Sequence, residues 1–173
     1  MRPVSLLLAG VLCLSAQTKF EMWPGATYDP AIPTMQKVLG YAPGERVAPP
    51  SDIVRYFEAL AAAAPNRIKV AEYAQSWEKR KLIYAAVGSE ANIRRLAEIQ
   101  ANMKRLADPR KTPAADAQRI IQTTPAVIML AYGVHGNEIS GPDAAMMTAY
   151  HLLAARNDKT VTDILANTLV LID

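Results

Sequence analysis

The chain has 173 residues, of which 51% are hydrophobic and 20% are charged, and its formal net charge is +3 at pH 7. This length fits one domain with an appendage, and the composition is that of an ordinary globular protein. The small net charge gives no electrostatic case for a nucleic-acid partner. The basic stretch at 103–111 is interrupted by Asp108 and Pro109, so we expect a solvated helix end there.

Residues 1–16 have the features of a secretory signal peptide. Arg2 supplies a positive charge, residues 4–14 are apolar, and Ala16 offers a cleavage point. The apolar stretch is too short to cross a bilayer as a helix, so we expect no membrane span after cleavage. The single cysteine, Cys13, lies within this segment, so the mature chain should hold no disulfide. The sequence therefore predicts a secreted or periplasmic protein.

Residues 17–50 form a Pro-rich N-terminal arm. Proline disfavours helix at the residue before it, so we expect an extended arm with one short helix near 34–39. The apolar content of the arm favours docking on the core over a flexible linker. Four side chains could anchor it: Tyr28, Ile32, Leu39 and Tyr41.

From residue 51 onward, segments with helical spacing of apolar residues alternate with short apolar runs. Apolar residues at three- and four-residue steps indicate helices, and bounded apolar runs indicate strands. The expected helices cover 51–64, 89–107, 112–122, 140–155 and 158–166. The expected strands cover 68–73, 81–87, 125–132 and 168–173.

The strands predict the fold class. The strands over 68–73 and 81–87 flank a tight turn and should pair antiparallel. The strands over 125–132 and 168–173 are nearly continuous apolar runs joined by a helical crossover, so we expect a parallel pair buried on both faces. We expect 125–132 to be central and 168–173 to lack a neighbour on one side. The result is an α/β fold: a mixed, mostly parallel sheet with helices on both faces.

His135 and Glu138 follow the third strand, in the segment that begins at Tyr132 and reads Tyr-Gly-Val-His-Gly-Asn-Glu. An imidazole nitrogen and a carboxylate oxygen from one turn are good ligands for Zn²⁺. Open α/β sheets bind ligands at this carboxyl edge. Gly133 and Gly136 would permit a sharp turn and a close backbone approach. The metal-free alternative is a carboxylate favoured at a helix N-terminus beside a turn histidine.

No credible third zinc ligand follows before Asp173. His151 lies thirteen residues beyond Glu138 on the same expected helix, which places it roughly 20 Å away. We expect it to be a packed or surface histidine. Asp143 is nearer, but it would have to fold back across a turn. No catalytic residue is assigned in this chain.

Three segments resemble the zinc carboxypeptidase, or M14 metallopeptidase, family. His135 and Glu138 after an apolar strand match the first two zinc ligands of the family. Residues 73–80, Tyr-Ala-Gln-Ser-Trp-Glu-Lys-Arg, are similar to its Tyr-Gly-x-Ser-x-Glu-Gly-Arg segment, with Ala74 and Lys79 in place of the glycines. The closing run Leu-Val-Leu-Ile-Asp is similar to a strand that precedes a Pro-x-x-Asn-Pro-Asp-Gly segment in the family.

The resemblance covers 51–173 and implies the N-terminal portion of a zinc carboxypeptidase-like domain, truncated after about half of it. It implies a metallocarboxypeptidase that hydrolyses peptide bonds in a peptide or protein substrate through a zinc-bound water. Zn²⁺ would be held by His135, Glu138 and a later histidine. The general base and the arginines would also come later, so we expect the 173-residue chain alone to be inactive.

Two alternatives stay open. Asn137 stands where many peptide-cutting members have arginine, and the string Gly-x-His-Gly-Asn-Glu also resembles the related aspartoacylase and succinylglutamate desuccinylase deacylases. The signal peptide and the segment over 73–80 favour the exported peptidase. The second alternative is a metal-free structural or interaction domain.

Overall fold

The computed structural model describes residues 21–173, and the expected signal peptide lies outside them. No helix within 21–173 is long and apolar enough to cross a membrane. The elements, in chain order, are β1 (Thr27–Tyr28), α1 (Met35–Leu39), α2 (Pro50–Ala63), β2 (Ile68–Gln75), β3 (Lys81–Val87), α3 (Glu90–Arg94), α4 (Leu96–Leu106), α5 (Ala114–Thr123), β4 (Ala126–Leu130), α6 (Ser140–Ala154), β5 (Ala155–Arg156), α7 (Lys159–Asn167) and β6 (Thr168–Ile172).

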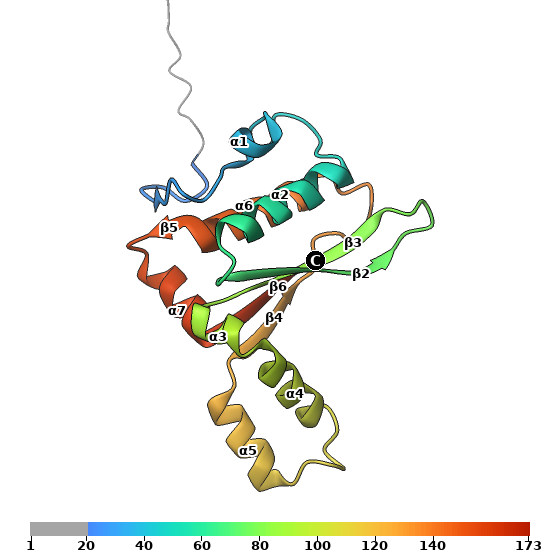
Figure 1. Ribbon diagram of the computed structural model, residues 1–173, viewed down its shortest axis with the longest axis vertical. Helices are drawn as coiled ribbons and strands as arrows, with labels where there is room; N and C mark the ends of the chain where they lie inside the picture. The colour runs from blue at the N-terminus through green and yellow to red at the C-terminus, as the bar shows by residue number, and fades with distance from the viewer. Residues whose placement is uncertain (1–20) are drawn as a thin grey trace, which may run out of the picture.

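A four-stranded mixed sheet in the order β2-β3-β6-β4 forms the centre of the fold (Figure 1). β3 pairs antiparallel with both β2 and β6, whereas β4 and β6 pair parallel, as the helical crossover predicts. Three strands therefore run in one direction and β3 opposes them. The mixed α/β fold is confirmed. The expectation of a mostly parallel sheet holds for strand direction but not for pairing, since only one of the three pairings is parallel.

The position of β4 corrects the sequence-based expectation. β4 is an edge strand of the described sheet, and its Ile128 and Met129 are 47% and 62% exposed. β6 lies between β3 and β4, so it is the strand with two neighbours, and its Leu169, Val170 and Ile172 are buried. Both strands are apolar runs, and composition alone does not say which of two such strands is inserted between others.

Helices cover both faces of this sheet, as predicted. α2 and α6 lie over one face, where Tyr56 and Met146 are fully buried in the main core (Figure 1). α3 and α4 cover the other face, where Ile99 packs in a smaller core. Successive β3 residues point to opposite faces, so Val87 joins the main core and Ala86 the smaller one.

The N-terminal arm packs against α2 and α6. Three of the four expected anchors are buried in the main core, and the fourth, Tyr28, is half-buried. The Tyr56 hydroxyl donates a 3.0 Å hydrogen bond to the carbonyl of Pro33. β1 of the arm pairs antiparallel with β5. The described part of the arm is therefore docked, as its apolar residues predict.

The helix expected over 89–107 is broken. Arg95 has φ −107° and ψ 24° and separates α3 from α4. Its guanidinium donates a 2.9 Å hydrogen bond to the carbonyl of Thr123, the last residue of α5. Met103, expected in the core, is 39% exposed, because α4 and α5 project beyond the sheet together (Figure 1).

Candidate metal centre

The loop over 131–139 joins β4 to α6 at the carboxyl edge of the sheet. Its start is fixed by two backbone hydrogen bonds that continue the parallel pairing past the strands. The amide of Tyr132 donates to the carbonyl of Asp173 at 3.2 Å, and the amide of Asp173 donates to the carbonyl of Leu130 at 3.1 Å. The loop therefore lies where open α/β sheets bind ligands.

His135 and Glu138 come together on this loop. The His135 Nδ1 atom lies 3.0 Å from the Glu138 Oε1 atom, and their side chains are 64% and 60% exposed. The amide of Glu138 donates a 3.1 Å hydrogen bond to the carbonyl of His135, which closes the turn between them. The predicted juxtaposition of an imidazole nitrogen and a carboxylate oxygen is present.

The donor set of this pair suits a zinc ion. Imidazole nitrogen and carboxylate oxygen are both common zinc ligands, and a separation of 3.0 Å lets one ion contact both atoms. A zinc site takes three or four protein ligands. Within residues 21–173, no three His, Cys, Asp or Glu side chains are grouped to hold a metal ion. The pair alone would therefore be an incomplete ligand set.

The structure corrects the expectation that Gly133 and Gly136 are needed for a sharp turn and a close backbone approach. Neither Gly133 nor Gly136 has a positive φ, and a Cβ at either position would meet no atom within 4 Å. The glycine that the geometry requires is Gly141, in the first turn of α6. A Cβ there would lie 2.3 Å from the carbonyl oxygen of Tyr132. The close approach is between α6 and the end of β4, and local sequence gives no signal for it.

His151 and Asp143 take no part in the pair. His151 is a packed histidine, as expected: its ring stacks on Trp23 with centroids 3.9 Å apart, and its Nδ1 lies 3.1 Å from the Tyr28 hydroxyl. Burial lowers the pKa of His151, and the nearby Asp158 carboxylate opposes that shift. Asp143 accepts a 2.9 Å hydrogen bond from the amide of Gly44 and so joins α6 to the arm.

The hairpin between β2 and β3 lies at the same edge of the sheet. The Ser76 hydroxyl accepts a 3.2 Å hydrogen bond from the amide of Arg80, and Arg80 pairs with Glu78. Lys79 has φ 62°, in the left-handed region that favours glycine. This conformation explains why the similar segment of the zinc carboxypeptidases has a glycine at the position of Lys79.

One hydrogen bond and one cavity near the loop have no counterpart in the sequence analysis. The Tyr73 hydroxyl donates a 2.8 Å hydrogen bond to the Asp173 carboxylate. A cavity of about 260 Å³ borders them and is also lined by Phe57, Tyr132 and Gly133. The sequence placed Tyr73 and Asp173 near the ends of predicted strands, but it could not predict their hydrogen bond. That bond depends on how β2, β3 and β6 pair, which involves residues far apart in the chain.

Comparisons with known proteins place the chain beside one family and one similar solved structure. The zinc carboxypeptidase model of the M14 peptidases matches residues 53–172. The crystal structure of carboxypeptidase A from Helicoverpa armigera is similar, with a TM-score of 0.44 and 18% identity, over 80% of this chain and 29% of that chain. The chain thus spans less than a third of the length of that relative. A search of curated proteins finds no match.

Proposed function

The chain belongs to the zinc carboxypeptidase family, and we propose that it is the N-terminal portion of the catalytic domain of an exported metallocarboxypeptidase. In this proposal His135 and Glu138 are two of the zinc ligands. The observation that carries it is the 3.0 Å approach of His135 Nδ1 to Glu138 Oε1 at the carboxyl edge of the sheet. In this proposal the arm over 17–50 is an appendage of the domain, and its described part, 21–50, is docked on the main core.

Each of the two side chains has a distinct role. When bound, zinc acts as a Lewis acid toward a scissile carbonyl and makes water a nucleophile at neutral pH. His135 offers a neutral nitrogen, and Glu138 offers a negative oxygen that offsets part of the charge of the ion. The backbone hydrogen bonds of Tyr132 and Asp173 hold the start of the loop to the end of β6, so the loop that carries the pair is anchored at the sheet edge.

The remaining groups come from outside this chain in our proposal. Two ligands leave the zinc geometry undetermined, so we expect the 173-residue chain to bind zinc weakly. It also lacks an assigned general base and oxyanion group, each of which contributes orders of magnitude in rate. We therefore expect no turnover by the 173-residue chain alone. The substrate of the whole protein would be a peptide or protein outside the cytoplasm.

One observation favours a second candidate. Asn137 precedes the Glu138 ligand where many peptide-cutting members have arginine. The same string occurs in aspartoacylase-like deacylases, which hydrolyse the amide of an N-acylated amino acid. The segment over 73–80 supports the peptidase, because its hydroxyl and charged side chains lie at the same sheet edge as the loop.

The test compares the 173-residue chain with a longer protein that continues past Asp173. We expect the longer protein to hold one zinc per chain by mass spectrometry and to release C-terminal residues from peptides. His135→Ala and Glu138→Gln should each remove both properties. Glu58→Gln is the matched control, because Glu58 is an exposed carboxylate on α2. Retention of zinc and hydrolysis by a double His135/Glu138 variant contradicts the proposal, and hydrolysis of N-acyl amino acids alone selects the deacylase.

A further inference from the structure

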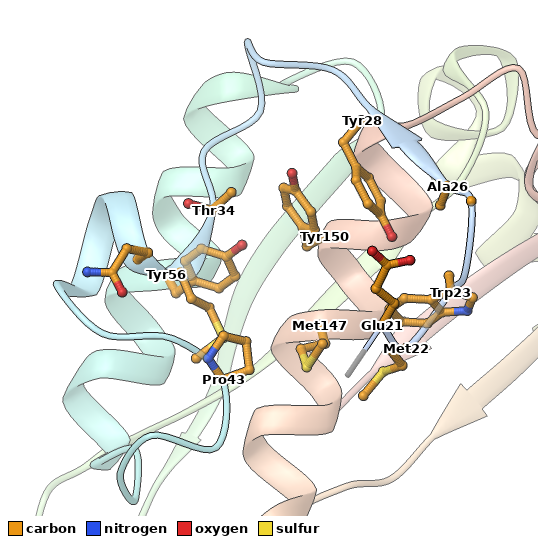
Figure 2. Close-up of a pocket in the computed structure, with 13 residues that line it drawn as sticks. Glu21, Met22, Trp23, Ala26, Tyr28, Thr34, Pro43, Tyr56, Met147 and Tyr150 are labelled. Atoms are coloured by element: carbon orange, nitrogen blue, oxygen red, sulfur yellow. The ribbon is translucent and has the colours of Figure 1, made fainter. Parts of the chain in front are cut away.

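A second hollow in the molecule lies away from the metal loop. It has a volume of about 500 Å³ and is lined by residues of the arm, α2 and α6 (Figure 2). We call it the arm cavity. Met147 and Tyr150 line it from α6, two to three turns beyond the start of that helix at Ser140. His135 and Glu138 do not line it, so it is independent of the metal centre.

Aromatic rings form much of the wall of the arm cavity. Trp23 and Tyr28 come from the arm, Tyr56 from α2 and Tyr150 from α6. Figure 2 shows these four rings around the hollow, with the sulfur atoms of Met22 and Met147 at one side. The faces of aromatic rings carry partial negative charge and attract cations, most strongly in the case of tryptophan.

These rings are held in place before any ligand arrives. Trp23 stacks on His151 with an interplanar angle of 4°, and the Tyr28 hydroxyl lies 3.1 Å from the Nδ1 of the same histidine. The rings of Tyr28 and Tyr150 have centroids 5.0 Å apart. The Tyr56 hydroxyl is bound to a backbone carbonyl. A preformed wall lowers the entropic cost of binding.

The charge at the arm cavity is negative. Glu21 is the one charged side chain among the described residues that line it, and Figure 2 shows its carboxylate on the Tyr28 side of the hollow. Burial is the first cause that raises the pKa of Tyr28, and the carboxylates of Asp158 and Glu21 raise it further. An anionic ligand is therefore disfavoured here, and a cationic ligand is favoured.

We propose that the arm cavity binds a small organic cation of the quaternary or alkylated ammonium class. The methyl groups of such a cation would contact the partly exposed rings of Trp23, Tyr28 and Tyr150, whereas the Tyr56 ring is fully buried and supports the wall. The positive charge of the cation would face the Glu21 carboxylate. This combination of aromatic faces with one carboxylate is the chemistry that recognises a weakly hydrated cation. The volume lies within the range of small-molecule sites.

The test uses choline as the probe and Trp23 as the reporter. The chain has two tryptophans, and Trp77 is fully exposed, so Trp77→Phe leaves Trp23 as the sole indole. In this background we expect choline to change the fluorescence in a saturable manner. Its neutral isostere, in which carbon replaces the ammonium nitrogen, should bind more weakly.

Two variants separate the charge from the aromatic wall. Glu21→Gln keeps the shape of an exposed side chain, and we expect it to weaken choline binding about two- to fivefold. Tyr150→Leu removes one ring and should weaken it to a similar extent. Glu58→Gln and His135→Ala should leave it unchanged. If Tyr150→Leu unfolds the chain, the choline affinity of Glu21→Gln tests the proposal alone.

Three outcomes overturn the proposal. Absence of saturable binding shows that the arm cavity is closed to the cation, including the case in which another segment of the chain fills it. Equal binding of the neutral isostere shows a cavity that selects apolar shape. Equal affinity in the Glu21→Gln and parent proteins shows that the carboxylate does not recognise the charge.

Discussion

The Tyr73 hydroxyl and the Asp173 carboxylate are joined by a 2.8 Å hydrogen bond that passes over β3 from the edge strand β2 to the end of β6. The bond is the first cause that raises the pKa of Tyr73, because ionisation of the phenol would remove the donor and place two negative charges together. The bond therefore clamps three strands at the edge that carries the candidate metal centre.

Removal of this clamp should lower stability modestly. We expect Tyr73→Phe to reduce the free energy of unfolding by about 1 kcal/mol, since Tyr73 is 54% exposed and water competes for the bond. Tyr84→Phe is the control, because no hydrogen bond to its hydroxyl is present among the described residues. Urea denaturation measures both. Equal effects of the two variants would show that the clamp contributes nothing.

Replacement of Lys79 by glycine should stabilise the folded chain. Its φ of 62° costs an L-residue about 1–2 kcal/mol, and part of the gain from glycine is offset by the larger entropy of the unfolded chain. We expect Lys79→Gly to raise the free energy of unfolding by about 0.5 kcal/mol. Ala74→Gly, within β2, should lower it by about 0.5–1 kcal/mol. Loss of stability in Lys79→Gly would count against the hairpin conformation described above.

His151 should make stability depend on pH. Burial lowers its pKa in the folded state below the ordinary value of 6.5, so the unfolded chain binds more protons in the window just below that value. The contribution of neutral His151 to the free energy of unfolding should therefore be fully present above pH 6.5. It should fall as the pH drops below 6.5 and level off below the pKa of His151 in the folded state. His151→Phe should flatten this step, whereas His135→Asn should retain it. Chemical denaturation between about pH 5 and 8 checks the profile.

Gly141 should tolerate no side chain. Its Cβ would lie 2.3 Å from the carbonyl oxygen of Tyr132, so α6 or the end of β4 must move. We expect Gly141→Ala to cost about 2 kcal/mol of stability. Gly136→Ala should stay within about 0.5 kcal/mol, because its Cβ would meet no atom within 4 Å. Thermal unfolding of the two variants measures the contrast, and equal melting temperatures would refute it.

Among residues 21–173, β4 pairs on one side only, and its other edge should promote self-association of the 173-residue chain. Met129 is 62% exposed on this edge strand, and unpaired apolar edges recruit other strands. Met129→Lys should reduce concentration-dependent association in light scattering. Val134→Lys is the control, since Val134 is 67% exposed but lies on the loop. An equal effect of both lysines would indicate a general charge effect.

Local signals of the sequence predicted most of the longer helices and strands and the candidate pair. Apolar spacing predicted the helices apart from the break at Arg95, and the spacing of His135 and Glu138 predicted that their side chains converge, because neither depends on distant residues. The structure places His135 Nδ1 3.0 Å from Glu138 Oε1. The family resemblance is confirmed over 53–172.

Features that depend on distant residues were not predicted. Arg95 breaks a helix by donating to the carbonyl of Thr123. Gly141 is required by Tyr132 across a loop. The arm cavity needs rings from three segments that are brought together only in the folded chain. Each of these contacts is fixed by tertiary packing, which either overrides the local preference of the sequence or leaves no signal in it.

The insertion of β6 between β3 and β4 also constrains when the sheet can assemble. During synthesis, β2 and β3 emerge as a hairpin that can form on its own, whereas β4 emerges without a partner strand. Only β6, the last of the four to leave the ribosome, joins the two halves. Its pairing with β3 closes a loop of more than eighty residues between Val87 and Val170, so joining the four described strands carries a high contact order and should be a slow step of folding.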